Sequence, residues 1–165
     1  MNKIIITGTS RGIGNAIAKN LLKQNFTVIG ISREHTIKHK NYFAISFDLN
    51  DNKNIKNILD DIIFNHKKID AIISSAGYGV FENLENLKEK EVIDFFNVNL
   101  LAHILISKIL VSHFKKKKTG HFIFIGSEAS LKGNQKSTLY SSAKHGLLGF
   151  VKSFREECNK SEIRV

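Results

Sequence analysis

The sequence has no proline, a single cysteine and no long uninterrupted apolar run. A disulfide-stabilised scaffold is therefore excluded, and Cys158 is typical of a protein in a reducing compartment or of one indifferent to redox state. No apolar run approaches the roughly 20 residues needed to span a bilayer. The N-terminal segment MNKIIITGTS has too short an apolar stretch for a signal peptide. We therefore expect a cytoplasmic protein with no membrane partner.

The absence of proline is unusual, because average usage of roughly 5% predicts about eight prolines in a chain of 165 residues. The remaining composition is ordinary, with 42% hydrophobic and 24% charged residues. A chain of this length buries roughly 70% of its unfolded surface, so it needs neither a metal nor a disulfide to fold. These figures predict one soluble domain over residues 1–165, with no metal site.

The formal net charge of +10 raises the question of nucleic-acid binding. Only four of the 25 basic residues are arginines, and the lysines are scattered rather than clustered. The one run, Lys115 to Lys118, follows a long apolar helical pattern, and cations favour a helix C-terminus. We therefore expect a solvated helix end and no nucleic-acid partner, although the charge would speed the association of an anionic ligand.

Short β-branched runs alternate with longer helical patterns along the whole chain, which predicts an α/β fold with a parallel sheet. Strands are predicted at Lys3–Thr7, Thr27–Ser32, Tyr42–Phe47, Asp70–Ser74 and His121–Ile125, with a sixth beginning at Glu162–Val165. Helices are predicted at Ile13–Gln24, Asn54–Phe64, Lys88–Phe114 and Ser137–Asn159.

The loops that follow these strands hold most of the unusual residues. Right-handed crossovers between parallel strands place every strand-to-helix loop at the carboxyl edge of the sheet. Thr7-Gly8, Asp48, Ser74 to Gly77 and Gly126-Ser127 all follow strands. Four loops are therefore expected to meet at one crevice.

The loop after the first strand, TGTSRGIG at positions 7 to 14, contains three glycines in seven positions. The spacing G-x3-G-x-G differs from the more common G-x-G-x-x-G, but both permit a tight turn and a close approach of the backbone to a pyrophosphate. The helix that follows supplies N–H donors and the positive end of its dipole. A strand-to-helix turn that merely favours glycine is the alternative. The loop predicts a dinucleotide site.

The second strand ends in Ser32-Arg33, without the acidic residue that would bind the ribose 2′-OH of NAD. Arg33 and Arg11 can both pair with a phosphate, so NADP(H) is favoured over NAD(H). A solvated surface arginine is the alternative for Arg33. Asp48 suits a hydrogen bond to the adenine edge, although a helix N-cap role is an alternative.

Tyr140 and Lys144 stand four residues apart at the start of the last predicted helix, which places them on one face. Ionising an isolated tyrosine at pH 7 costs roughly 4 kcal/mol, and a neighbouring Lys⁺ favours the phenolate. Tyr140 is therefore a candidate general acid/base, and Ser127 a candidate donor to the substrate oxygen. Each signal is weak alone, and their combination with the glycine loop is specific.

The chain resembles the short-chain dehydrogenases/reductases. The resemblance rests on TGTSRGIG at 7 to 14, Asp48-Leu49, SSAG at 74 to 77, Asn97-Val98-Asn99, Ser127 and YSSAK at 140 to 144. It implies a Rossmann-type doubly wound domain and hydride transfer between NADP(H) and a carbonyl or secondary alcohol. The implied catalytic residues are Tyr140, Lys144, Ser127 and Asn99, the last supporting a proton-relay water. The expected cofactor-binding residues are Gly8, Ser10, Arg11, Gly12, Ile13, Gly14, Arg33, Asp48, Leu49, Ser75, Ala76, Gly77, Tyr140 and Lys144.

Two departures from the family pattern qualify this expectation. Ser74 and Ser75 replace the usual asparagine pair, so we expect weaker support of the adjacent strands. The sequence also ends where the family continues into a substrate loop and a further strand, which predicts a C-terminally truncated chain and explains part of the missing proline. The alternative function is therefore a catalytically inactive dinucleotide-binding or subunit-interaction protein.

The helices predicted at 88–114 and 137–159 are expected to form the interface of a homo-oligomer, as the family resemblance implies. The first is apolar on more than one face, which also fits a deeply buried helix of a monomer. The substrate is expected to be a small molecule.

Overall fold

A computed structural model describes residues 2–165. Its strands are β1 (Lys3–Thr7), β2 (Thr27–Ser32), β3 (Tyr42–Ser46), β4 (Ala71–Ser74), β5 (Gly120–Phe124) and β6 (Ile163–Arg164). Its helices are α1 (Gly12–Lys23), α2 (Ile55–His66), α3 (Glu89–Phe96), α4 (Ala102–Lys117) and α5 (Thr138–Cys158). Three short helical segments complete the elements: η1 (Leu84–Asn86), the π-helical η2 (Asn97–Leu101) and η3 (Glu128–Ser130).

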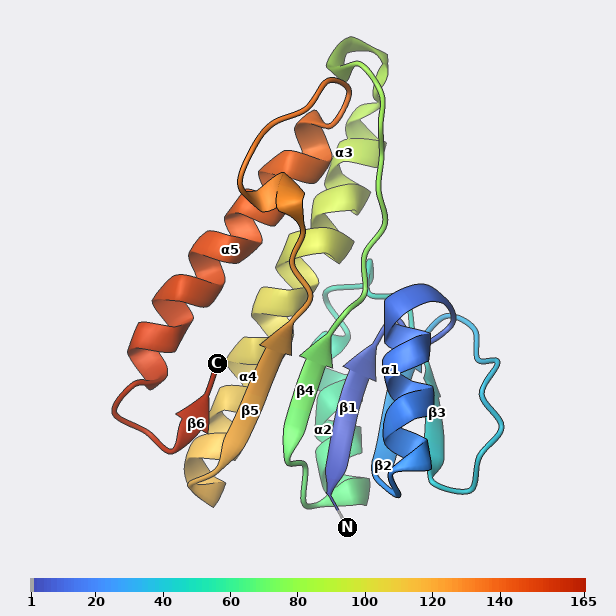
Figure 1. Ribbon diagram of the computed structural model, residues 1–165, viewed down its shortest axis with the longest axis vertical. Coiled ribbons are helices and arrows are strands. Elements are labelled where there is room, and N and C mark those ends of the chain that lie inside the picture. Colours follow the sequence, from blue (N-terminus) through green and yellow to red (C-terminus); the bar gives the residue numbers. More distant parts are fainter. Residues whose placement is uncertain (1) are drawn as a thin grey trace.

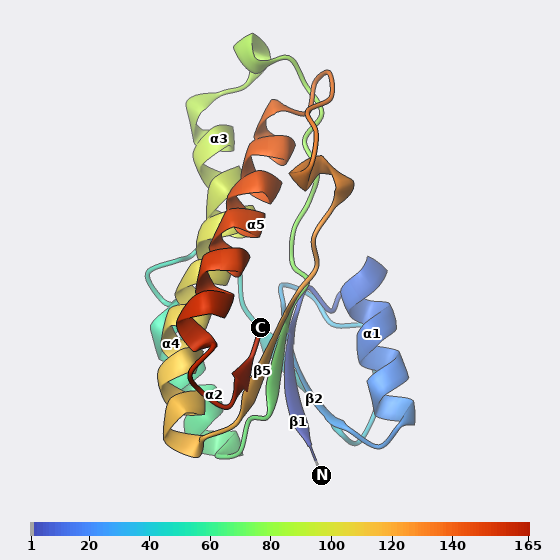
Figure 2. The ribbon, with the colours of Figure 1, turned by 60° about the vertical axis from the view of Figure 1, so that its left-hand side comes forward.

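The strands form one parallel sheet in the order β3-β2-β1-β4-β5-β6. Helix α1 lies on one face, and α2, α4 and α5 lie on the other (Figures 1 and 2). The predicted doubly wound α/β fold is therefore confirmed. The sheet order reverses at β1 and β4, and a crevice is expected at the carboxyl edge of such a reversal.

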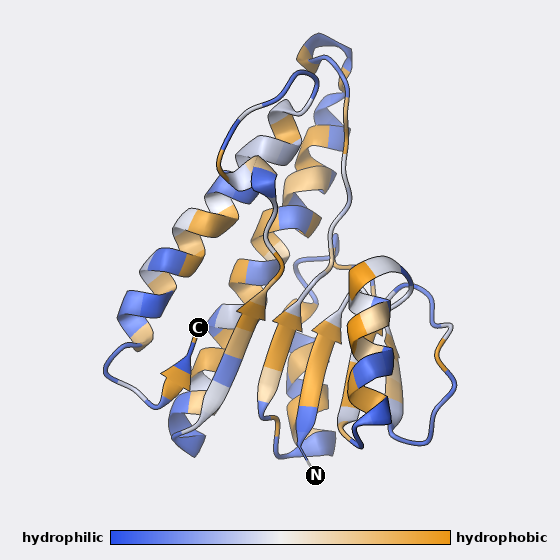
Figure 3. Ribbon diagram, viewed as in Figure 1, coloured by the Kyte–Doolittle hydropathy of each residue, from blue (hydrophilic) through white to orange (hydrophobic). Residues whose placement is uncertain are grey.

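Of three buried apolar clusters within residues 2–165, the two with the most residues hold the helices against the sheet. The larger lies beneath α2, α4 and α5 and includes Leu110, Phe114 and Phe122, each at most 1% exposed. The smaller joins α1 to β1, β2 and β4, with Ile6, Ala18 and Leu22 among its members. Figure 3 shows apolar residues along the central strands and alternating apolar and polar turns along α5. This pattern is expected where both faces of a parallel sheet are covered.

The long helix predicted at 88–114 differs from the observed structure in two ways. It is divided into α3 and α4 by η2, and it continues to Lys117. Lys115 to Lys117 form the last turn and Lys118 has left-handed backbone geometry, so the lysine run does end a helix as predicted. The other predicted elements agree with the structure to within two residues.

The helical run Glu89–Lys117 is also long and apolar enough to cross a membrane, judged by length and composition alone. This differs from the expectation that no part of the chain is long and apolar enough to span a bilayer. Within the protein, Ala102, Ile106 and Leu110 of this run are at most 1% exposed and belong to the larger apolar cluster. A core helix of this kind passes the same test as a membrane span.

Candidate active site

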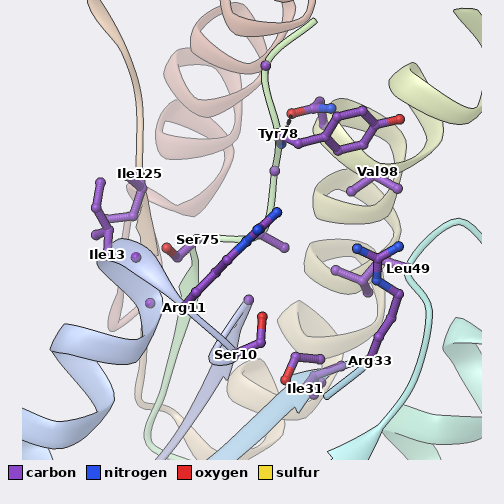
Figure 4. A pocket seen from close by; sticks show the side chains of 18 of the residues that line it. Ser10, Arg11, Ile13, Ile31, Arg33, Leu49, Ser75, Tyr78, Val98 and Ile125 are labelled. Carbon is purple, nitrogen blue, oxygen red and sulfur yellow. Dashed lines mark hydrogen bonds between the residues drawn. The ribbon is translucent and has the colours of Figure 1, made fainter. Parts of the chain in front are cut away.

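A cleft of about 510 Å³ lies at the carboxyl edge of the sheet, between the loops after β1, β2, β3, β4 and β5 (Figure 4). Nearly all of the site residues predicted from the sequence line it. The predicted residues that line the cleft are Gly8, Ser10, Arg11, Gly12, Ile13, Gly14, Arg33, Asp48, Leu49, Ser75, Ala76, Gly77, Asn99, Tyr140 and Lys144. The exception is Ser127, which follows the lining residue Gly126.

The glycine loop crosses the floor of this cleft in a conformation that side chains would obstruct. Gly8 and Gly12 have φ of 78° and 62°, values that L-residues with a Cβ rarely adopt. A Cβ on Gly8 would lie 2.8 Å from the Cα of Ala76, and one on Gly14 would lie 2.4 Å from the Gly8 carbonyl oxygen. The glycines thus allow three segments of backbone to meet at one point.

The N-terminus of α1 opens onto the same cleft. Its N-cap residue, Arg11, makes no side-chain capping hydrogen bond, and the first turn carries no acidic residue. The N–H groups of this turn therefore have no side-chain acceptor within the described helix, and the helix dipole favours an anion there. The loop and helix fit the pyrophosphate that the sequence predicts.

Two arginines lie at the cleft, Arg11 within the glycine loop and Arg33 directly after β2, and Figure 4 shows the side chains of both. Both residues are exposed, and the ion pairs formed within residues 2–165 involve neither of them. Their guanidinium groups are therefore available to a phosphate. Asp48 accepts a hydrogen bond from the Asn50 N–H at 3.0 Å, which stabilises a local turn. The alternative N-cap role for Asp48 is wrong, because Asn54 occupies the N-cap of α2.

The loop after β4 is held by two residues that were not among the predicted site residues. Thr7 Oγ1 accepts hydrogen bonds from the N–H groups of Ser75 and Ala76 at 3.0 and 3.1 Å. On the far side, His103 Nε2 lies 3.0 Å from the Ala76 carbonyl oxygen, so this nitrogen carries the proton and donates. The Ser74 hydroxyl is buried without a partner among the described residues. Support thus comes from Thr7 and His103 rather than from Ser74.

Asn99 is fully buried in the π-helical segment η2. Its Nδ2 donates to the Phe95 carbonyl at 3.0 Å, and its Oδ1 accepts from the Tyr78 N–H at 3.0 Å. These two hydrogen bonds fix the loop after β4, and the second Nδ2 hydrogen is not used in them. Single π-turns inside α-helices are frequent at functional sites, and here the turn lies beside the cleft.

Lys144 and Tyr140 extend into the cleft region from α5. Lys144 is 7% exposed, and its Nζ donates to the Ile125 carbonyl at 3.0 Å. Burial lowers the pKa of the Lys144 ammonium from its ordinary value. The Nζ atom lies 5.9 Å from the centre of the Tyr140 ring, so the cation is close enough to act on the phenol.

An aromatic side chain lies beside the ring of Tyr140. The Tyr140 ring centre lies 5.7 Å from that of Phe81. Phe81 is 64% exposed, so its ring is open to a ligand. The site therefore combines a polar cradle at one end with an apolar surface near the tyrosine.

Ser127 occupies the N-cap of η3 rather than the cleft lining. Its Oγ accepts a hydrogen bond from the Ala129 N–H at 3.2 Å, and its carbonyl accepts one from the Ser130 N–H at 3.0 Å. The hydroxyl hydrogen is not used in these contacts and can be donated elsewhere.

The model of the short chain dehydrogenase family matches residues 2–165. The chain is 38% identical over 168 residues to the 3-oxoacyl-[acyl-carrier-protein] reductase FabG of Buchnera aphidicola, covering 97% of this chain and 68% of that protein. It is 30% identical over 172 residues to carbonyl reductase family member 4 of Xenopus laevis, covering 100% of this chain and 73% of that protein.

Solved structures show the same architecture. A metagenomic short-chain oxidoreductase in complex with NADP superposes with a TM-score of 0.94 at 27% identity, covering 99% of this chain and 78% of that one. A 4-hydroxyisoleucine dehydrogenase complexed with NADH has a TM-score of 0.94 at 25% identity, covering 100% of this chain and 73% of that one. Relatives of this fold therefore bind either nicotinamide dinucleotide.

Proposed function

Because the chain belongs to the short-chain dehydrogenase family of oxidoreductases, we propose that it transfers a hydride between NADP(H) and a carbonyl or secondary alcohol. The proposal depends chiefly on one observation. Tyr140 and Lys144 line the same cleft as the glycine loop, although about 130 positions separate them from it in the sequence. A tyrosine–lysine pair that only stabilised its helix would not need to line the same cleft as the glycine loop.

When bound, the nicotinamide would supply or accept the hydride. Tyr140 would then donate a proton to the substrate oxygen in reduction and remove one in oxidation. Lys144 has a fixed position through its hydrogen bond to the Ile125 carbonyl, and its Nζ lies 5.9 Å from the Tyr140 ring centre, so its charge is beside the group that would transfer the proton. Ser127 would donate its free hydroxyl hydrogen to the same oxygen, and Asn99 would support the proton-relay water.

The proposed preference for NADP(H) depends on Arg11 and Arg33. Both guanidinium groups are free of the ion pairs of the described chain, and no carboxylate occupies the last position of β2. A 2′-phosphate would gain charge-assisted hydrogen bonds from either arginine. Wild-type affinity for NADPH and NADH, measured by fluorescence titration, tests this preference directly.

The substrate is proposed to be a small molecule with an apolar portion. Phe81, which is 64% exposed, provides apolar surface beside the Tyr140 ring. A carbonyl directed toward the phenol would place its remaining carbon chain against this surface. Turnover of ketones with increasing alkyl chain length should therefore favour the longer members of the series.

A second candidate is dinucleotide binding without turnover. It is favoured by the position of Ser127, which lies outside the lining of the cleft and already accepts the Ala129 N–H. Incubating the protein with NADPH and a panel of ketones separates the two functions. NADPH binding with turnover supports the first, binding without turnover supports the second, and absence of nucleotide binding contradicts both.

Replacing Tyr140 with phenylalanine tests the catalytic role itself. Loss of the hydroxyl should abolish turnover while leaving NADPH affinity nearly unchanged, because the ring and Lys144 remain. Survival of turnover in Tyr140→Phe would show that another group transfers the proton.

Assembly and location are proposed on separate grounds. The helices at 88–114 and 137–159 are the proposed surface of a homo-oligomer, since Ile93 and Leu101 remain 52% and 40% exposed on the first of them. Sedimentation velocity of the purified chain tests this. A cytoplasmic location fits the buried, unpaired thiol of Cys158, and fractionation of cells expressing the protein tests it.

A further inference from the structure

A group of polar side chains connects the segments that carry Arg11 and Arg33. It joins Thr9 of the glycine loop, Ser32 and His35 from the segment that carries Arg33, and Tyr42 at the start of β3. Thr9 and Ser32 are at most 7% exposed, and Tyr42 is half-buried. None of the roles proposed above uses these four residues.

The contacts among them allow a single consistent direction of donation. The Ser32 hydroxyl donates to the Glu34 carbonyl at 2.7 Å, so its one hydrogen is used. Thr9 Oγ1, 3.1 Å from Ser32 Oγ, must then be the donor in that contact. The Tyr42 hydroxyl, 2.8 Å from Thr9 Oγ1, must donate in turn, because the Thr9 hydrogen is already used.

The last link fixes the tautomer of His35. Its Nδ1 lies 2.8 Å from the Tyr42 oxygen, whose hydrogen points to Thr9, so Nδ1 must carry a proton and donate. If Tyr42 instead donated its hydrogen to His35 Nδ1, the imidazole proton would be on Nε2. That nitrogen is buried with no partner among the described residues. A buried donor without an acceptor is costly, which favours the same direction.

Other observations show that the structure accommodates this chain of hydrogen bonds. A Cβ on Gly30, in the middle of β2, would lie 2.2 Å from the Tyr42 hydroxyl oxygen, so glycine makes room for the phenol. Burial raises the pKa of Tyr42, although the bond to Thr9 opposes the shift, so the phenol keeps its hydrogen. Asn15 and Thr36 also bind the backbone of the glycine loop. Asn15 Nδ2 donates to the Thr9 carbonyl, and Thr36 Oγ1 donates to the Ser10 carbonyl.

We propose that the chain His35 to Tyr42 to Thr9 to Ser32 holds the Arg33 segment against the glycine loop and thereby sets selectivity for a 2′-phosphate. Tyr42 is the central positioning residue, since among the described residues its hydroxyl makes the one hydrogen bond between β3 and the glycine loop. Arg33 directly follows Ser32, and Arg11 lies two residues after Thr9. Fixing Ser32 to Thr9 therefore limits the movement of one guanidinium relative to the other. This inference depends on the proposed binding of NADP(H).

The decisive variant is Tyr42→Phe, which keeps the ring and removes only the hydroxyl. We expect the ratio of NADP⁺ to NAD⁺ affinity to fall by about tenfold, with NAD⁺ affinity nearly unchanged. His35→Leu removes the imidazole that donates to the Tyr42 hydroxyl. His35 lies in a loop outside the sheet, and we expect a smaller fall in the ratio of NADP⁺ to NAD⁺ affinity. The controls are Ser161→Ala, which deletes a hydroxyl bonded to the Cys158 carbonyl at the end of α5, and His39→Leu, which alters the same loop as His35. Neither control should change the ratio.

A spectroscopic measurement tests the chain of hydrogen bonds independently of nucleotide. ¹⁵N-resolved imidazole spectra of the unmodified protein should show neutral His35 as the Nδ1–H tautomer, and Tyr42→Phe should shift it toward Nε2–H. Finding Nε2–H in the unmodified protein overturns the inference. An unchanged affinity ratio in Tyr42→Phe, with NADP⁺ binding intact, overturns it as well and leaves the proposed function standing. Failure of the unmodified chain to bind either dinucleotide overturns both.

Discussion

Mild acid is expected to destabilise the protein through one buried imidazole, that of His103. This residue is 1% exposed and donates from Nε2 to the Ala76 carbonyl, while its Nδ1 is buried with no partner in the described chain. Burial, with a smaller contribution from the charge of Lys144, lowers the pKa of His103 from 6.5 to about 4. A proton added at Nδ1 would find no acceptor and would sit near a second cation.

The sign of the effect follows from which state binds the proton first. The unfolded chain takes up a proton at His103 near pH 6.5, whereas the folded protein does so only near pH 4. Between these values the unfolded state binds more protons, so stability falls as the pH falls. At about 1.4 kcal/mol per pKa unit, the full difference from 6.5 to about 4 amounts to about 3 kcal/mol, of which about 2 kcal/mol is lost by pH 5.

Urea unfolding at pH 8 and pH 5, followed by circular dichroism, measures this loss. His103→Gln keeps an amide N–H that can reach Ala76 and removes the titration, so its stability should fall by about 2 kcal/mol less than that of the wild type. His113→Gln alters a half-buried histidine on the same helix, away from the cleft, and should retain most of the wild-type loss. An equal loss in His103→Gln and the wild type would refute the reasoning.

Two further variants test the dinucleotide end of the cleft. Arg33→Asp should repel a 2′-phosphate and offer a carboxylate to a ribose hydroxyl, so the preferred dinucleotide should change from NADPH to NADH in fluorescence titrations; an unchanged preference would remove Arg33 from the site. Gly14→Ala would place a Cβ 2.4 Å from the Gly8 carbonyl oxygen, so the loop must shift. We expect at least a tenfold loss of NADPH affinity and a lower melting temperature, whereas Gly133→Ala, with open space around it, should behave like the wild type.

The strands and the glycine loop could be predicted because their signals are local. Runs such as KIIIT carry enough β-branched residues to define a buried strand to within one residue. The π-turn at Asn97–Leu101 could not be predicted, because a single extra residue within a long apolar helix hardly changes its periodicity. The cleft itself was predicted from the rule that loops after parallel strands share one edge.

The residues missed were single polar side chains whose partners lie far away in sequence. His103 and Tyr42 each stand alone in an apolar segment, and their partners, Ala76 and Thr9, lie 27 and 33 residues away. No spacing rule connects such pairs. Ser127 differs from these residues because it was predicted as a site residue. In the structure its hydroxyl caps η3 and does not line the cleft.

The strand order also determines when the middle of the sheet can form during folding. β1 pairs with β2 and with β4, and the bond from the Lys3 N–H to Asp70 spans 67 residues. A chain emerging from the ribosome can therefore assemble β1, β2 and β3 early but must leave one edge of β1 open until β4 appears. Without proline, no slow prolyl isomerisation is available to limit refolding. The closure of this long-range pair is thus expected to be the slow step.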